Sequence, residues 1–117
     1  LPSGTTLILD DENQAVSLKD SNGENALEID LKGGNVALKA KTKLELSAGD
    51  TSITLTAQGE MTQKAKTKIS MESASLEEKG NSQVSIEGAG VAVKANGTLD
   101  LQAAGTTTVK GAMVNIN

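Results

Sequence analysis

The chain has 117 residues, with 11 basic and 15 acidic side chains and a formal net charge of −4. It contains no Phe, Tyr, Trp, Cys or His, which excludes disulfides and thiolate chemistry and removes most catalytic triads and zinc sites. Acidic and basic residues are interspersed and form no basic face, so we expect no nucleic-acid partner.

The missing aromatic residues also limit the kind of core that the chain can build. Aromatic side chains usually supply the largest buried areas, and only 37% of the residues are hydrophobic. A compact globule of this length would be under-filled, whereas a narrow core of Val, Leu, Ile and Ala needs no aromatic ring. We therefore expect an elongated molecule, or one that completes its core with other copies of itself.

The chain opens at Leu1-Pro2-Ser3-Gly4 without a methionine, and we expect it to be a piece of a longer protein. No stretch approaches the roughly 18 apolar residues of a membrane-spanning helix, and no signal peptide is visible. We therefore expect a protein that is made in the cytoplasm without a signal peptide.

Residues 1–32 are interpreted as a neck, a meander of strands that leads into the region beyond. The segments DDEN (10–13) and DSNGEN (20–25) separate the strands and are typical of acidic turns. Their composition is similar to that of calcium loops, but neither has the EF-hand spacing, so solvated corners are the expected interpretation. The predicted strands are Thr6–Leu9, Ala15–Leu18 and Ala26–Leu31.

From residue 33 onward the sequence is a series of short blocks, most of them eight residues long. Examples are KTKLELSA (41–48), NSQVSIEG (81–88) and NGTLDLQA (96–103). Each block carries two apolar residues in alternation and closes on a small residue, which places all three on one face of a strand. Gly and Asn near the block starts suit a bend. These residues are Gly34, Gly49, Gly59, Asn81, Asn96 and Gly97.

A period of eight residues with one strand per block describes a triangular β-prism, in which successive strands lie on successive faces. A flat sheet of such strands would expose two long edges, whereas a prism pairs every edge except those at its ends. A single-chain solenoid should show a super-period of three blocks, and none is visible, which favours three chains wound together. The expected fold is an all-β, intertwined trimeric triangular β-helix with residues 33–117 as its needle.

The least regular stretch is residues 58–80, where Met61, Ile69 and Leu76 also fit a helical stripe. The blocks continue through it without a break, so strand is expected and helix is the alternative. On a strand, the pattern points Gln63 toward the core. Three copies of that side chain could then hydrogen-bond around the axis or hold water.

The expected trimer core consists of the aliphatic residues at the inward positions of the blocks. These residues are Val36, Leu38, Leu44, Leu46, Ile53, Leu55, Ile69, Met71, Val84, Ile86, Val91, Val93, Leu99 and Leu101.

Blocks such as KTKLELSA, NGTLDLQA and AGTTTVKG, with the closing VNIN, resemble the C-terminal β-helix of valine-glycine-repeat (Vgr) spike proteins. The wider group includes the central spikes of contractile phage tails, type VI secretion systems and related extracellular injection particles. The opening TTLILDDENQAVSLKDSNGENALEID resembles the stretch that follows the oligonucleotide/oligosaccharide-binding-fold domain in that family. The resemblance covers essentially the whole chain.

The resemblance implies an intertwined homotrimer at the head of an injection tube, joined to tube or baseplate proteins through a missing N-terminal region. It also implies a PAAR-type tip protein on the blunt C-terminal end, and the alternative is that this end simply frays. Some spikes of this group hold a metal through histidine at the apex, but this chain has no His, so we expect no metal and no cofactor. The expected docking residues are Met113, Val114, Ile116 and Asn117.

The expected function is therefore that of a structural, cell-puncturing spike and not of an enzyme. Such a spike would touch a target membrane transiently, as part of an injection particle delivered extracellularly or into a target cell. Two alternatives stay open: a trimeric β-prism stalk of a fibre or adhesin, and a single-chain β-solenoid with a binding function.

Overall fold

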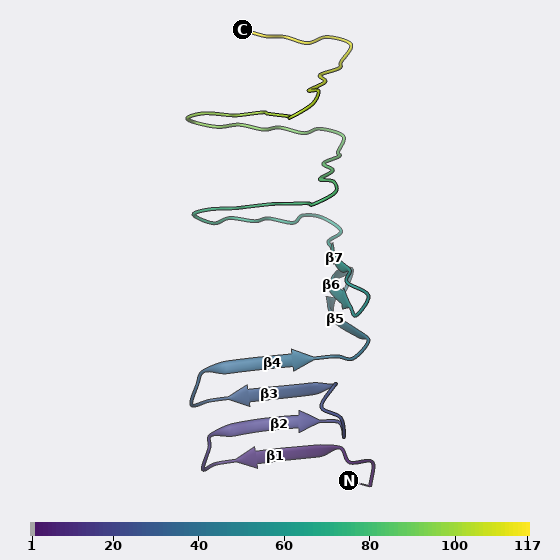
Figure 1. Cartoon of the computed structure of the whole chain (residues 1–117), viewed down its shortest axis with the longest axis vertical. Helices are drawn as coiled ribbons and strands as arrows, with labels where there is room; N and C mark the ends of the chain where they lie inside the picture. Colours follow the sequence, from purple (N-terminus) through teal and green to yellow (C-terminus); the bar gives the residue numbers. More distant parts are fainter. Residues whose placement is uncertain (1) are drawn as a thin grey trace. The chain divides into compact units, whose positions relative to one another are not determined.

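A computed structural model describes residues 2–117 of the chain (Figure 1). The described residues form seven strands in two antiparallel sheets and contain no helix. The all-β expectation is confirmed, and the helix considered for residues 58–80 is absent. The chain divides into two units, of which the first ends at Ser73 and the second spans Ala74–Asn117.

The first sheet contains β1 (Thr6–Asp10), β2 (Ala15–Lys19), β3 (Ala26–Asp30) and β4 (Asn35–Lys39). The strands follow one another in the order β1-β2-β3-β4, and each neighbouring pair is antiparallel. The three strands expected within residues 1–32 are therefore present, each with an end that differs by one residue from the expected one. The fourth strand of this sheet is the first strand of the region with the eight-residue period.

The second sheet contains β5 (Lys43–Ala48), β6 (Thr51–Thr56) and β7 (Met61–Lys64), in the order β5-β6-β7. Only Gly49 and Asp50 separate β5 from β6. Gly49 has a φ of 57°, which a two-residue hairpin turn with glycine at its first central position requires.

Aspartates at the strand ends fix the turns of the first sheet. The backbone N–H of Asn13 donates to Asp10 Oδ1 at 3.0 Å, and the Asn13 side chain donates to Asp10 Oδ2 at 2.8 Å. The side-chain bond from Asn13 is the main reason that the pKa of Asp10 lies below its ordinary value. Asp30 Oδ1 accepts the N–H of Gly33 at 2.8 Å in the same way. These acidic segments are turns held by their own side chains.

Strand connectivity between β4 and β7 differs from the expected winding. In the prism, every strand would move to a new face, whereas β5, β6 and β7 fold back on one another as hairpins. Only the step from β4 to β5 enters a new sheet. The short turns reverse the chain, and pairing between adjacent strands satisfies backbone N–H and C=O groups without a partner chain.

The second unit contains no strand in the part of the chain described, and Figure 1 draws it as straight runs joined by bends. Each bend coincides with the first residues of a sequence block and follows the previous bend by seven or eight residues. The bends expected at Asn81, Asn96 and Gly97 are therefore observed. Within this unit the bends lie at residues 74, 81–82, 89–90, 96–97, 104–105 and 112.

Candidate functional site

The register of the first sheet builds one aliphatic face across all four strands. Leu7 faces Leu18, Leu18 faces Leu27, and Leu27 faces Leu38. Directly opposed side chains on one face of a sheet pack against each other, so these residues form a ladder. A second ladder lies on the same face, two residues away from the first on each strand. Its members are Leu9, Val16, Ile29 and Val36.

This aliphatic face is uncovered in a single copy of the chain. Leu9 is 76% exposed, Val36 is 71% exposed and Leu38 is 52% exposed. Among the described residues, Ala26 is the one buried hydrophobic residue, and the register places it on the opposite face, with Glu28. A monomeric protein rarely leaves so large an apolar surface in water. The face is therefore a candidate surface for assembly.

The second sheet carries the same kind of face. Leu46 of β5 faces Ile53 of β6, and Ile53 faces Gln63 of β7. Gln63 lies on the aliphatic face, as the sequence pattern predicts, and its Nε2 atom is 3.9 Å from the sulfur of Met61. A single amide thus interrupts an otherwise aliphatic surface. The neighbouring ladder of this sheet consists of Leu44, Leu55 and Met61.

The second unit exposes both its aliphatic pairs and its backbone. Paired strands end at Lys64, and in the described chain no residue from 76 onward makes a hydrogen bond with another residue. Extended backbone of this kind requires water or a strand of another chain as its partner. The exposed pairs in these runs are Val84 and Ile86, Val91 and Val93, and Leu99 and Leu101.

The structure brings together only part of the predicted core. The positions from Val36 to Leu55 lie on the aliphatic faces of the two sheets, whereas those from Ile69 to Leu101 lie in unpaired chain. Six residues of β1–β3 share the aliphatic face but are missing from the predicted core, although their strands show the same alternation. These residues are Leu7, Leu9, Val16, Leu18, Leu27 and Ile29.

The opposite face of the first sheet is polar. Lys19 Nζ lies 2.6 Å from Glu28 Oε1, and Lys39 Nζ lies 3.5 Å from Glu28 Oε2. The hydrogen bond and charge of Lys19, with the charge of Lys39, hold the pKa of Glu28 below its ordinary value of 4.5. Both lysines face Ala26 across the strands, so their aliphatic stems cover it. This face is suited to water.

We expect Glu28→Gln to lower the Tm at neutral pH by no more than about 5 °C, because exposed ion pairs contribute little. The pKa of Glu28 is lowered by folding, so its stabilisation is present above pH 4.5 and is lost as the pH falls through the lowered value. The Tm values of the wild type and of Glu28→Gln should therefore become equal at acidic pH. Thermal unfolding followed by circular dichroism between neutral pH and about pH 2 checks this. A difference that persists in acid would contradict it.

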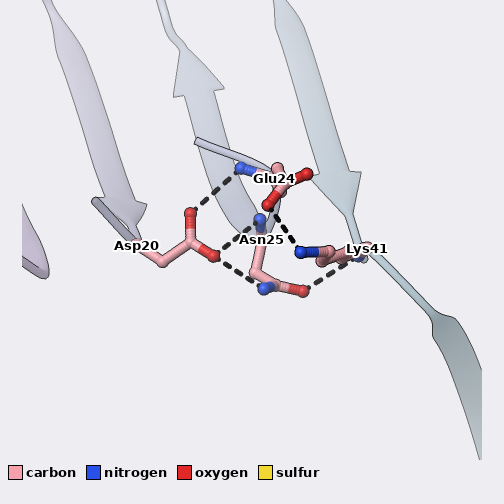
Figure 2. A network of polar contacts seen from close by, with 4 residues as sticks. All are labelled: Asp20, Glu24, Asn25 and Lys41. Carbon is pink, nitrogen blue, oxygen red and sulfur yellow. Dashed lines mark hydrogen bonds and ion pairs between the residues drawn. The ribbon is translucent and has the colours of Figure 1, made fainter. Parts of the chain in front are cut away.

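A polar cluster fixes the corner between the two sheets (Figure 2). The Asn25 side chain donates to Asp20 Oδ2 at 2.7 Å, and Asn25 Oδ1 accepts the backbone N–H of Lys41 at 3.0 Å. Lys41 Nζ also lies 3.2 Å from Glu24 Oε2. The bond from Asn25 is the main reason that the pKa of Asp20 lies below its ordinary value. The turn after β2 therefore holds the connection that follows β4.

The described residues offer little for other chemistry. They contain no group of three or more acidic, His or Cys side chains that could hold a metal ion. No helix in the described part of the chain could cross a membrane. The expected docking residues at the C-terminal end are exposed, with Met113 at 79% and Ile116 at 89%.

Comparisons of the chain with protein-family models, curated proteins and solved structures gave no significant match. The likeness to Vgr-type spikes therefore depends on the sequence pattern, and the trimeric fold and its partners stay predictions.

Proposed function

We propose that the chain is one third of a rigid, homotrimeric spike that leads a contractile injection system through a target envelope. The observation that carries this proposal is the uncovered aliphatic face of both sheets, with Ala26 as the one buried hydrophobic residue in the described chain. A fold with one apolar face per sheet is stable only when another surface covers that face. Three copies with these faces inward supply the missing core.

Strand length supports an arrangement of three walls. A strand of five residues is about 17 Å long, and an equilateral triangle of that side has an inscribed radius of about 5 Å. The backbones of two packed sheets lie about 10 Å apart, so the side chains of each wall extend about 5 Å inward. The side chains of three such walls meet at the axis without a void. Val, Leu and Ile fill this space, which is consistent with a chain that has no aromatic residue.

The second unit supports pairing between chains. Its runs bend at the block starts and make no strand pairs with one another in the described part of the chain. A single-chain solenoid would satisfy its backbone by stacking its own coils. Three chains wound together would satisfy the same groups with strands of the other copies, and would leave free edges only at the ends.

A spike of this kind acts through shape and stiffness. Separating the copies would expose the whole aliphatic column at once, and each buried Leu or Ile contributes about 2 kcal/mol. We propose that the exposed C-terminal residues around Met113 and Ile116 seat a PAAR-type tip protein, and that upstream sequence joins the spike to the tube or baseplate. Contact with the target membrane is then transient and mechanical.

The mass of the particle in solution is the first test of this proposal. The chain has a mass of 11.9 kDa, so the trimer requires three times that value, or about 36 kDa. Light scattering coupled to size-exclusion chromatography measures it directly. A monomer would overturn the proposal, and a dimer would replace the prism by a two-layer sandwich. A trimer without a PAAR-type partner, encoded among fibre genes, would favour the stalk of a fibre or adhesin.

The tip-docking surface gives a second expected result. Ile116→Asp should weaken binding of a PAAR-type tip protein at least tenfold, because an apolar contact of about 2 kcal/mol is lost and a charge is introduced. The mass of the trimer should not change, since Ile116 is 89% exposed and belongs to no strand of the described chain. Surface plasmon resonance with the immobilised trimer measures the affinity. Equal affinity of the two proteins would place the docking surface elsewhere.

A further inference from the structure

The sequence contains two Asn-Gly dipeptides, Asn22-Gly23 and Asn96-Gly97, and both are exposed. Asparagine before glycine is open to spontaneous deamidation, because glycine has no side chain to shield its backbone nitrogen. The deprotonated glycine nitrogen bonds to the asparagine Cγ, the bond from Cγ to Nδ2 breaks, and ammonia leaves. Water then opens the succinimide ring, to aspartate or to isoaspartate. The reaction therefore requires a glycine nitrogen that is free to attack.

The first of these sites is closed by its own turn. The backbone N–H of Gly23 donates to the carbonyl of Asp20 at 3.1 Å, so the nitrogen that must attack is already engaged. The Asp20 carboxylate also accepts the N–H of Glu24 at 3.0 Å and the N–H of Asn25 at 3.3 Å, which holds the turn (Figure 2). Asn22 can react only after this set of hydrogen bonds has opened.

The second site has no such protection in a single copy. Asn96 and Gly97 form one of the bends of the second unit, and in the part of the chain described neither makes a hydrogen bond with another residue. A Cβ atom on Gly97 would meet no atom within 4 Å, and its φ lies outside the left-handed region. Gly23, by contrast, has a φ of 70°. The turn at Gly23 requires glycine, whereas the bend at Gly97 does not.

We infer that Asn96 is a site of spontaneous deamidation that is open in the single chain and closed by assembly. The closure rests on the proposed trimer, in which strands of other copies pair with the free backbone of the second unit. Isoaspartate would carry the main chain through Cβ, and so would add a backbone atom between Val93 and Leu99. A copy altered in this way no longer matches the strands of unaltered copies. Deamidation thus limits how long an unassembled chain can still join a trimer.

The experiment compares each site with the same sequence in a free peptide. Trypsin cuts after lysine, so it releases residues 20–32 and residues 95–110 as separate peptides, each with one Asn-Gly dipeptide. Single copies are supplied by Leu46→Asp, or by Leu38→Lys should the first variant aggregate, because each places a charge on an aliphatic face. Each protein is aged in mildly alkaline buffer, and mass spectrometry of the two peptides follows the conversion of amide to acid.

In single copies, Asn96 should convert as fast as in its free peptide, and Asn22 should convert at least about tenfold more slowly than in its own, because its turn must open first. Two slow sites would overturn the inference, and so would two fast sites in a protein that keeps its β-sheet circular dichroism. Gly97→Ala is the matched variant, since the bend has room for a methyl group. It should slow conversion at Asn96 several-fold and leave Asn22 unchanged. An unchanged rate at Asn96 would exclude the Gly97 nitrogen as the attacking group.

In the wild-type trimer, Asn96 should convert more slowly than in single copies. An equal rate in a particle of trimer mass would overturn the closure and leave the proposed function intact. A particle of monomer mass with a fast Asn96 would overturn the proposed function and the closure, but would confirm the open site. Wild-type chains aged in urea and returned to buffer should form trimers depleted of isoaspartate at position 96. Trimers with the same isoaspartate content as the aged chains would overturn the limit on assembly.

Discussion

Leu46→Asp should abolish assembly of the trimer. Leu46 lies opposite Ile53 on the aliphatic face of the second sheet, and the proposed trimer brings three copies of it to one narrow column. Three carboxylates there would be desolvated and would repel one another. A penalty of at least about 4 kcal/mol reduces the assembly constant about a thousandfold. Light scattering should show a mass near 12 kDa, or aggregate, in place of the trimer.

Ser47→Asp is the matched control for this prediction. Ser47 is the next residue of the same strand, is exposed, and points to the opposite face, so the same charge there should leave the mass unchanged. A second variant, Leu46→Ala, separates loss of assembly from loss of secondary structure. It should keep the β-sheet circular dichroism of the wild type and lower the Tm. A normal yield of trimer from Leu46→Asp would contradict an aliphatic axial core.

Much of the first sheet was predictable because its strands alternate and its turns carry Asp, Asn and Gly. The predicted strand of residues 15–18 is observed as β2, one residue longer, and the acidic segments beside it are turns. Period-two alternation determines which face a side chain lies on, and turn residues determine where a strand stops. Both signals are local, so they can be found without an alignment.

The pairing partner of each strand was not predictable in the same way. The blocks around Leu46 and Ile53 have the same alternation whether the chain reverses at Gly49 or turns onto a new face. Gly49 followed by Asp50, with only these two residues between the strands, is a hairpin signal, but the same two residues also suit a bend onto a new face. An alternating pattern shows which side chains of a strand face the core, but not which strand lies beside it. A chain that forms hairpins and a chain that winds around a prism therefore have the same pattern.

The part of the aliphatic face that belongs to β1–β3 was not predictable, for a related reason. Leu18 and Leu27 belong to the same aliphatic face as Leu38, but wider spacing and acidic turns set their strands apart from the blocks. The register joins them, and register depends on turn lengths that the pattern of a single strand does not contain. The aliphatic surface therefore begins near the start of the chain.

Gln63→Glu should make assembly depend on pH. Gln63 shares its face with Ile53 and Leu46, so the proposed trimer gathers three of these side chains in an aliphatic layer. Burial and mutual repulsion raise the pKa of the three introduced carboxyl groups above the unfolded value of about 4.3. The assembled state is then stable below that value and loses stability as the pH rises through the raised pKa. We expect little trimer at pH 7.5 and recovery near about pH 4.

Two further variants isolate the position of the charge. Gln63→Leu keeps the layer apolar and should assemble at every pH, with a Tm equal to or above that of the wild type, because an apolar side chain needs no hydrogen-bond partner. Thr62→Glu places the same carboxyl on the opposite face of β7 and should follow the wild type across the pH range. Mass measured by light scattering at each pH compares all four proteins. If Gln63→Glu stayed trimeric at pH 7.5, Gln63 would face water, and the aliphatic faces would not meet at an axis.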